Sequence, residues 1–97
     1  MNEQSVITIY GRLGKNPELR QTKNNKPFCI FSLAEQIEGQ DKPRWHNVVM
    51  WEKDSEHWAK VLIKGSAVMV RGQLNERVYN HRQYFEINAE AIGLINS

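Results

Sequence analysis

The chain has 97 residues, of which 25% are charged and 40% are hydrophobic, and its formal net charge is +2 at pH 7. This length and composition indicate one small globular domain, residues 1–97, whose modest core would gain stability from self-association, and they exclude a strongly basic chain. A single cysteine excludes a disulfide framework, and the lack of an apolar run of ~18 residues or of a signal peptide at Met1 predicts a cytoplasmic protein without a membrane partner.

The first half of the chain has the pattern of strands separated by turns. Its long strands are Val6–Leu13, Phe28–Gln36 and Trp45–Trp51, and Glu18–Gln21 is a short return strand between the first two. The first strand ends at Gly14, residues 23–27 form a turn rich in asparagine and lysine, and residues 39–43 form a polar loop. These breaks divide the segment into short elements typical of an all-β domain.

The second half holds one helical pattern followed by a hairpin. Lys53–Ile63 predicts a helix, since Trp58 recurs with apolar residues at spacings of three and four, and Asp54 or Ser55 is the expected N-terminal cap. Trp58 is therefore assigned to packing. The last two strands are Ala67–Leu74 and Tyr84–Ile92, with Gly72 as a bulge or tight bend and the hairpin tip at Asn80–Gln83. Five long strands with one helix between the third and the fourth predict a five-stranded OB-fold barrel.

The third long strand carries two tryptophans on one face. Trp45, Asn47 and Trp51 share that face because strand side chains alternate, and the opposite face is mostly apolar. Tyr79 with Arg77 beside it adds another ring and cation near the hairpin. Bases stack on exposed rings whatever their identity, at about 1–3 kcal/mol per base. The pair therefore predicts a surface for single-stranded nucleic acid, and the alternative is that both rings belong to the core.

Basic residues are concentrated towards the start of the chain. Residues 1–31 carry a surplus of three positive charges, whereas residues 32–65 have a net charge of −1. Within the first of these segments, Arg12, Lys15 and Arg20 are candidate contacts for phosphates, and Asn47 beside the tryptophans is a candidate polar contact. The alternative is that these side chains form an ordinary solvated loop face.

Other chemistries find no support in the sequence. The candidate metal ligands do not have the spacing of a metal site; they are Cys29, His46, His57 and His81. Cys29 lies in an apolar strand and is expected to act as a small hydrophobic side chain. No phosphate-binding loop or acid–base pair is visible, so we expect no catalytic site, no metal and no cofactor.

Four motifs in order make the chain resemble the bacterial single-stranded DNA-binding proteins along almost its whole length. They are GRLGKNPELR at 11–20, FSLA at 31–34, WHNVVMW at 45–51 and KGSAVMVRGQL at 64–74. The resemblance implies a nucleoid-associated OB-fold protein that is not an enzyme. It further implies a homodimer or homotetramer that binds single-stranded DNA without sequence preference during replication, recombination or repair.

The resemblance also implies roles for individual residues. The positions that match stacking aromatics are Trp45, Trp51 and Tyr79. The positions that are basic in the family and near the DNA path are Arg20, Lys53, Lys64 and Arg77. His46 matches a histidine tied to subunit contacts, so it is expected to serve assembly.

Two departures from the family pattern leave alternatives open. The loop at 37–44 lacks a further stacking aromatic, which predicts weaker binding or a smaller footprint. The sequence stops at Ile95-Asn96-Ser97 without an acidic tip, so we expect no recruitment of other proteins by that route. One alternative is a dimer similar to primosomal replication protein N, whose relatives tend to lack the tryptophan pair. Others are a plasmid or phage paralogue, and an OB module that binds a protein partner.

Overall fold

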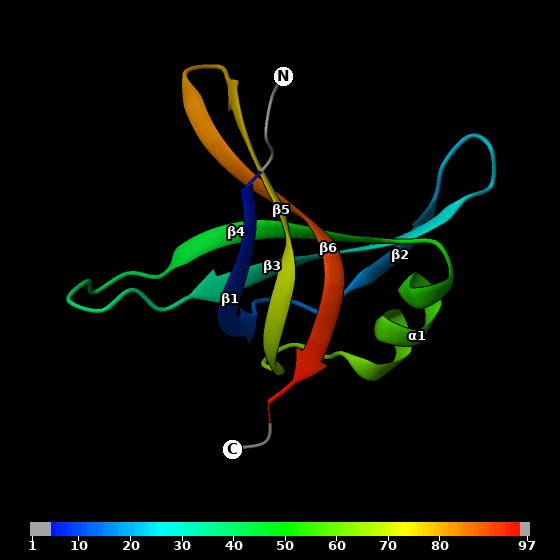
Figure 1. Ribbon diagram of the computed structural model, residues 1–97, viewed down its shortest axis with the longest axis horizontal. Helices are drawn as coiled ribbons and strands as arrows, with labels where there is room; N and C mark the ends of the chain where they lie inside the picture. The colour runs from blue at the N-terminus through cyan, green and yellow to red at the C-terminus, as the bar shows by residue number, and fades with distance from the viewer. Residues whose placement is uncertain (1–4, 96–97) are drawn as a thin grey trace.

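The computed structural model describes residues 5–95, except for the side chains of Arg77 and Tyr79. The elements in chain order are β1 (Ser5–Leu13), β2 (Glu18–Gln21), β3 (Pro27–Glu35), β4 (Arg44–Trp51), α1 (Lys53–Val61), β5 (Ala67–Tyr79) and β6 (Arg82–Leu94) (Figure 1). The predicted helix thus lies between the third and fourth long strands, which are β4 and β5 once the short strand β2 is counted. No helix within residues 5–95 has the length and apolar character needed to cross a membrane.

The sheet curls into a barrel of five strands. Its strand order is β1-β5-β6-β4-β3-β2, and a further antiparallel pairing of β1 with β3 closes the ring. The closing contact runs from Gly11, opposite Glu35, to Leu13, opposite Leu33, and β4 meets β6 in a short parallel contact at 47–49. Strand β2 pairs only with β3 among the described elements, so it extends the sheet outside the ring.

Two glycines allow strands to come close enough for this closure. A Cβ at Gly11 would lie 2.3 Å from the carbonyl oxygen of Ala34, where β1 meets β3. A Cβ at Gly72 would lie 2.1 Å from the carbonyl oxygen of Asn88, and the β5–β6 register shifts between Arg71 and Gly72. The predicted bulge is therefore confirmed opposite Gly72, where Glu90 of β6 is the extra residue, and larger residues at Gly11 or Gly72 would clash with backbone atoms.

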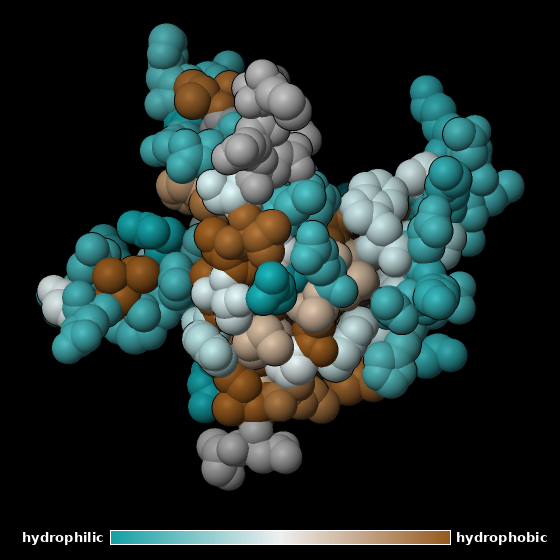
Figure 2. All heavy atoms as spheres, in the orientation of Figure 1, coloured by the Kyte–Doolittle hydropathy of each residue, from teal (hydrophilic) through white to brown (hydrophobic). Residues whose placement is uncertain are grey.

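The β5–β6 hairpin is longer than predicted. Pairing continues to Tyr79, opposite Arg82, so that only Asn80 and His81 form the turn. Both have positive φ, 51° and 64°, as a type I′ two-residue turn requires. Because this turn matches the twist of the strands, the ladder runs to its end and the hairpin projects from the barrel (Figure 1). Figure 2 shows that the β2–β3 turn, another projection, is covered by hydrophilic side chains.

The core fills the barrel from the inward faces of the strands. Its fully buried side chains include Leu33, Val48, Val68, Val70 and Ile87. Trp58 of α1 is partly buried against this core, which confirms its assignment to packing. The predicted cap of α1 is wrong: Glu52, with φ 60°, precedes the helix without a side-chain cap, and the buried Ser55 hydroxyl donates back to the Glu52 carbonyl.

Cys29 is a fully buried thiol on the inward face of β3, and burial raises its pKa from 9.0 to about 11. We predict that the folded protein does not react with Ellman's reagent at about pH 8, because the reactive thiolate is scarce and enclosed, whereas the urea-unfolded chain reacts in full. The thiol ionises first in the unfolded chain, so the free energy of unfolding decreases as the pH rises from 9.0 towards about 11. Urea titrations across this pH range test the predicted decrease in the free energy of unfolding, and Cys29→Ala is the control that should lack it. Rapid labelling of the folded protein by Ellman's reagent would contradict the predicted lack of reactivity.

Candidate functional site

The outward faces of β3 and β4 carry a row of four cross-strand pairs. From one end to the other the pairs are Ala34 with Trp45, Ser32 with Asn47, Ile30 with Val49, and Phe28 with Trp51. Trp45 is 53% exposed and Trp51 is 44% exposed. The alternative that both rings belong to the core is therefore wrong, and the row presents two large rings separated by smaller side chains.

Trp45 lies over the backbone at the end of β1. A Cβ placed on Gly14 would be 2.6 Å from a carbon of the Trp45 ring. The amide of Gly14 also donates to the carbonyl of Ser32, 3.1 Å away, which ties this segment to β3. Glycine at 14 therefore gives the indole a flat support, and any larger side chain would displace the ring.

Trp51 is held from two sides by residues that the sequence analysis did not select. The Phe28 ring lies 4.9 Å from the Trp51 ring, centroid to centroid, at an interplanar angle of 37°. The indole Nε1–H donates to Oδ1 of Asn88 on β6, 3.3 Å away. A ring fixed in this way loses little rotamer freedom when a ligand stacks on it. The alternation of side chains along residues 28–34 predicts that Phe28 and Ser32 share one face of the strand. It does not predict that Phe28 lies next to Trp51, because that contact depends on the register of β3 against β4.

A hollow of about 190 Å³ opens beside the middle of the row. Its lining includes Lys15, Asn16, Arg20, Ile30, Ser32 and Asn47. Arg20 pairs with Glu18 on β2, and both side chains are well exposed. Three of the predicted contacts, Lys15, Arg20 and Asn47, thus meet at one place beside the exposed rings.

Among the described side chains, Arg12, Lys53 and Lys64 do not line this hollow. Arg12 donates from Nη1 to the carbonyl of Gly65, 3.0 Å away. The backbone amide of Lys64 donates to Oδ1 of Asn16, 2.7 Å away, while Lys53 begins α1 two residues after Trp51. Arg77 and Tyr79 end β5, and their side chains lie outside the described part of the structure.

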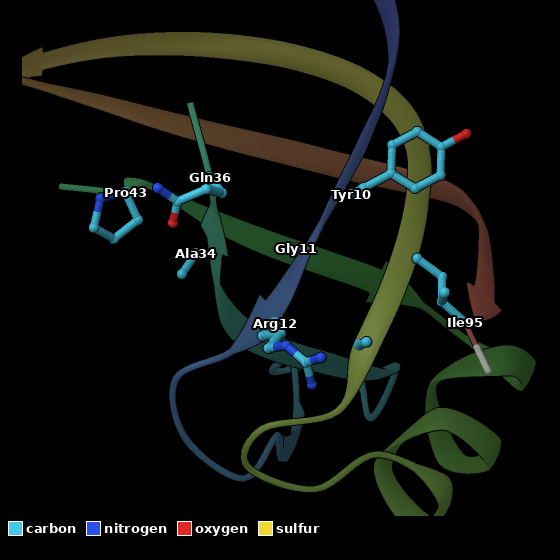
Figure 3. Close-up of a pocket in the computed structure, with 8 residues that line it drawn as sticks. Tyr10, Gly11, Arg12, Ala34, Gln36, Pro43 and Ile95 are labelled. Carbon is cyan, nitrogen blue, oxygen red and sulfur yellow. The ribbon is translucent and has the colours of Figure 1, made fainter. Parts of the chain in front are cut away.

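A second, larger hollow of about 490 Å³ lies along β1 (Figure 3). Its lining includes Tyr10, Arg12, Ala34, Gln36, Pro43 and Ile95. It borders the row of pairs at Ala34. Figure 3 shows Tyr10 and Ile95 on one side of this hollow, with Gln36 and Pro43 on the other. Arg12 therefore belongs to this second surface.

His46 lies on the inward face of β4 and is only 3% exposed. Its Nε2 lies 2.9 Å from Oε1 of Glu35, and its ring is 6.0 Å from that of Phe85. Its Nδ1 is buried without a hydrogen-bond partner among the described residues. Of the two partners, the Glu35 side chain is the less buried.

Comparisons with known proteins agree with this architecture. The model of the single-strand binding protein family matches residues 4–94. A single-stranded DNA-binding protein of Neisseria meningitidis serogroup A / serotype 4A is 33% identical over 96 residues, which cover 92% of this chain and 55% of that protein. Single-stranded DNA-binding protein A of Bacillus subtilis is 33% identical over 96 residues, covering 89% of this chain and 56% of the relative. The chain thus spans about half the length of these curated relatives.

A solved structure shows the same fold over almost the whole chain. The small single-stranded DNA-binding protein from Streptomyces coelicolor superposes with a TM-score of 0.84 at 24% sequence identity. The match covers 97% of this chain and 96% of that one. The predicted OB-fold barrel is therefore confirmed.

The contact between Trp51 and Asn88 generates a structural prediction. Asn88→Ala removes the acceptor of the indole N–H, so we expect that proton to exchange with solvent roughly fivefold faster, as for one lost hydrogen bond. The measurement is ¹H–¹⁵N NMR of the indole groups, with the Trp51 signal identified by its loss in Trp51→Phe. The Trp45 signal serves as the internal control. Unchanged exchange at Trp51 would contradict the contact.

Proposed function

The chain belongs to the single-strand binding protein family, and on that basis we propose that it binds single-stranded DNA with little sequence preference. The observation that carries this proposal is the pair of exposed tryptophans on the outward face of β4. Their positions are six residues apart, about 20 Å along an extended strand, so each ring can stack a different base of one strand. Stacking requires no base identity, because every base has a flat face.

The proposed contacts follow from the site. Trp45 and Trp51 stack bases, and Tyr79 adds a third ring. The proposed phosphate and polar contacts are Arg12, Lys15, Arg20, Asn47, Lys53, Lys64 and Arg77. The hollow beside the row supports Lys15, Arg20 and Asn47 most directly, because they line it together.

We propose one domain, residues 1–97, that acts by binding and not by catalysis. A single ring of strands and one core cluster support the single domain. Such a protein would serve wherever a duplex is opened, in replication, recombination or repair. The exposed tryptophan pair supports this function over a replication-restart dimer of the primosomal type.

Binding is tested by the fluorescence of the tryptophans. We predict that oligo(dT) quenches it and that the affinity decreases as salt is raised, because phosphate contacts release counterions. Trp51→Ala should weaken binding by about 1–3 kcal/mol, the value of one stacked base. Ile63→Ala, an exposed apolar residue after α1, is the control and should bind like the original chain. Absence of quenching at low salt would contradict the function and favour a module for a protein partner.

We also propose that the chain self-associates as a homodimer or homotetramer. Among the described strands, residues 5–10 of β1 pair with β5 alone, while pairing with β3 begins at Gly11. Val6 and Tyr10 are exposed on this strand, Tyr10 by 62%. An edge with free backbone groups and apolar side chains is a template for a strand of a second copy. A subunit role for His46, acting through Glu35, is part of this proposal.

Light scattering tests the self-association. The molar mass should be two or four times that of one chain, and Tyr10→Lys should lower it, because a charge on the edge strand opposes strand addition. Far-UV circular dichroism of the variant controls for folding. A mass of one chain for the original protein would contradict the proposal without affecting DNA binding.

A further inference from the structure

We propose that Ser32 and Asn47 form a hydrogen-bonding subsite for the pairing edge of one unpaired base, located between the stacking positions at Trp45 and Trp51. This inference rests on the proposed binding of single-stranded DNA and specifies how the middle of the same surface acts. It assigns a function to Ser32, which has no role in the stacking and phosphate contacts above, and a different one to Asn47.

The position of the pair in the row is the first support. Of the four cross-strand pairs, Ser32 with Asn47 is the one formed by two polar side chains, and it lies next to the pair that contains Trp45. Directly opposite residues of an antiparallel pair have Cβ atoms about 4.5–5.5 Å apart. The hydroxyl and the amide can therefore act on one small ligand together.

The second support is that both side chains are free to bind. Ser32 is half-buried and Asn47 is exposed, and neither side chain hydrogen-bonds another protein group in the part of the chain that the structure describes. Asn16, by contrast, uses its Oδ1 on the amide of Lys64. Polar groups in a recess, with their donors and acceptors unused by the fold, are available to a ligand.

The hollow gives this pair a place for a base and for its phosphate. Ser32 and Asn47 line the recess of about 190 Å³, together with the apolar side chain of Ile30. Lys15 and Arg20 line it too and supply positive charge for the backbone of the nucleotide. The recess thus combines a hydrogen-bonding pair, an apolar contact and two cations, of which Arg20 is paired with the carboxylate of Glu18, also part of the lining.

The chemistry of the pair explains why it would tolerate several bases. The pairing edge of thymine offers an acceptor, a donor and an acceptor, which complement the Asn47 amide N–H, the Asn47 carbonyl and the Ser32 hydroxyl. Turning the amide over matches cytosine, and rotating the hydroxyl so that it accepts matches guanine. Adenine offers one polar group fewer on this edge and leaves the hydroxyl without a partner.

The same chemistry distinguishes single-stranded from double-stranded DNA. In a duplex the pairing edge of each base is already bonded to the opposite strand, so it is not available to Ser32 and Asn47. A stacking ring alone reads only the face of a base. The subsite adds a direct requirement that the base be unpaired.

The test compares oligo(dT) with the same oligomer made from N3-methylthymine, which keeps the stacking face but blocks the pairing edge. The original protein should bind oligo(dT) about five- to tenfold more tightly, the effect of one or two hydrogen bonds. Ser32→Ala and Asn47→Ala should weaken binding of oligo(dT) more than binding of the methylated oligomer, so that the preference shrinks. Asn24→Ala, at an exposed asparagine in the β2–β3 turn, is the matched control and should retain the preference.

The outcomes separate the subsite from the proposed function. Equal binding of the two oligomers by the original protein would overturn the subsite while leaving single-stranded DNA binding intact. A preference that persists in both variants would also overturn it, because the edge would then be read elsewhere. No binding of oligo(dT) at all would instead overturn the proposed function. Both substitutions lie on the outward face, so we expect the two variants to fold normally. Thermal unfolding of each variant checks that a loss of binding is not due to misfolding.

Discussion

The antiparallel register of β3 against β4 is the constraint on which the rest of the structure depends. It places Leu33 opposite His46 and Phe31 opposite Val48 on the inward face, and Ser32 opposite Asn47 on the outward face. Because strand side chains alternate with a period of two, a slip of one residue would turn the core outward and bury the tryptophans. The apolar burial that stabilises the barrel therefore also determines which residues face a ligand.

Barrel closure depends in turn on close backbone approaches that only small residues allow. Gly11 lets β1 reach β3, and Gly72 lets β5 bend against β6. The part of β6 that lies against Gly72 includes Asn88, whose side chain accepts the hydrogen bond from the indole of Trp51. A geometric requirement of the fold thus contributes to the orientation of a ring in the candidate site.

The parts that could be predicted from sequence are those governed by local periodicity. Alternation along 45–51 is sufficient to group Trp45, Asn47 and Trp51, and the helical spacing of Trp58 is sufficient to assign it to packing. The supports of Trp51 could not be predicted, because Phe28 and Asn88 reach it only through the register of three strands distant in sequence. The hairpin was underestimated for a related reason. A two-residue turn with positive φ at Asn80 and His81 extends pairing into a polar segment that has little strand character of its own.

The proposed stacking rings and the proposed cations differ in how firmly the fold holds them. The proposed stacking rings lie on paired strands and are supported by Gly14, Phe28 and Asn88, so they lose little entropy on binding. The cations, in contrast, are exposed and partly engaged within the protein, as Arg20 is with Glu18, and the formal net charge is only +2. A phosphate must compete with that carboxylate, so Arg20 yields less net attraction than an unpaired arginine would. We therefore expect affinity on the proposed surface to depend more on oriented rings and hydrogen-bonding groups than on a strong positive field.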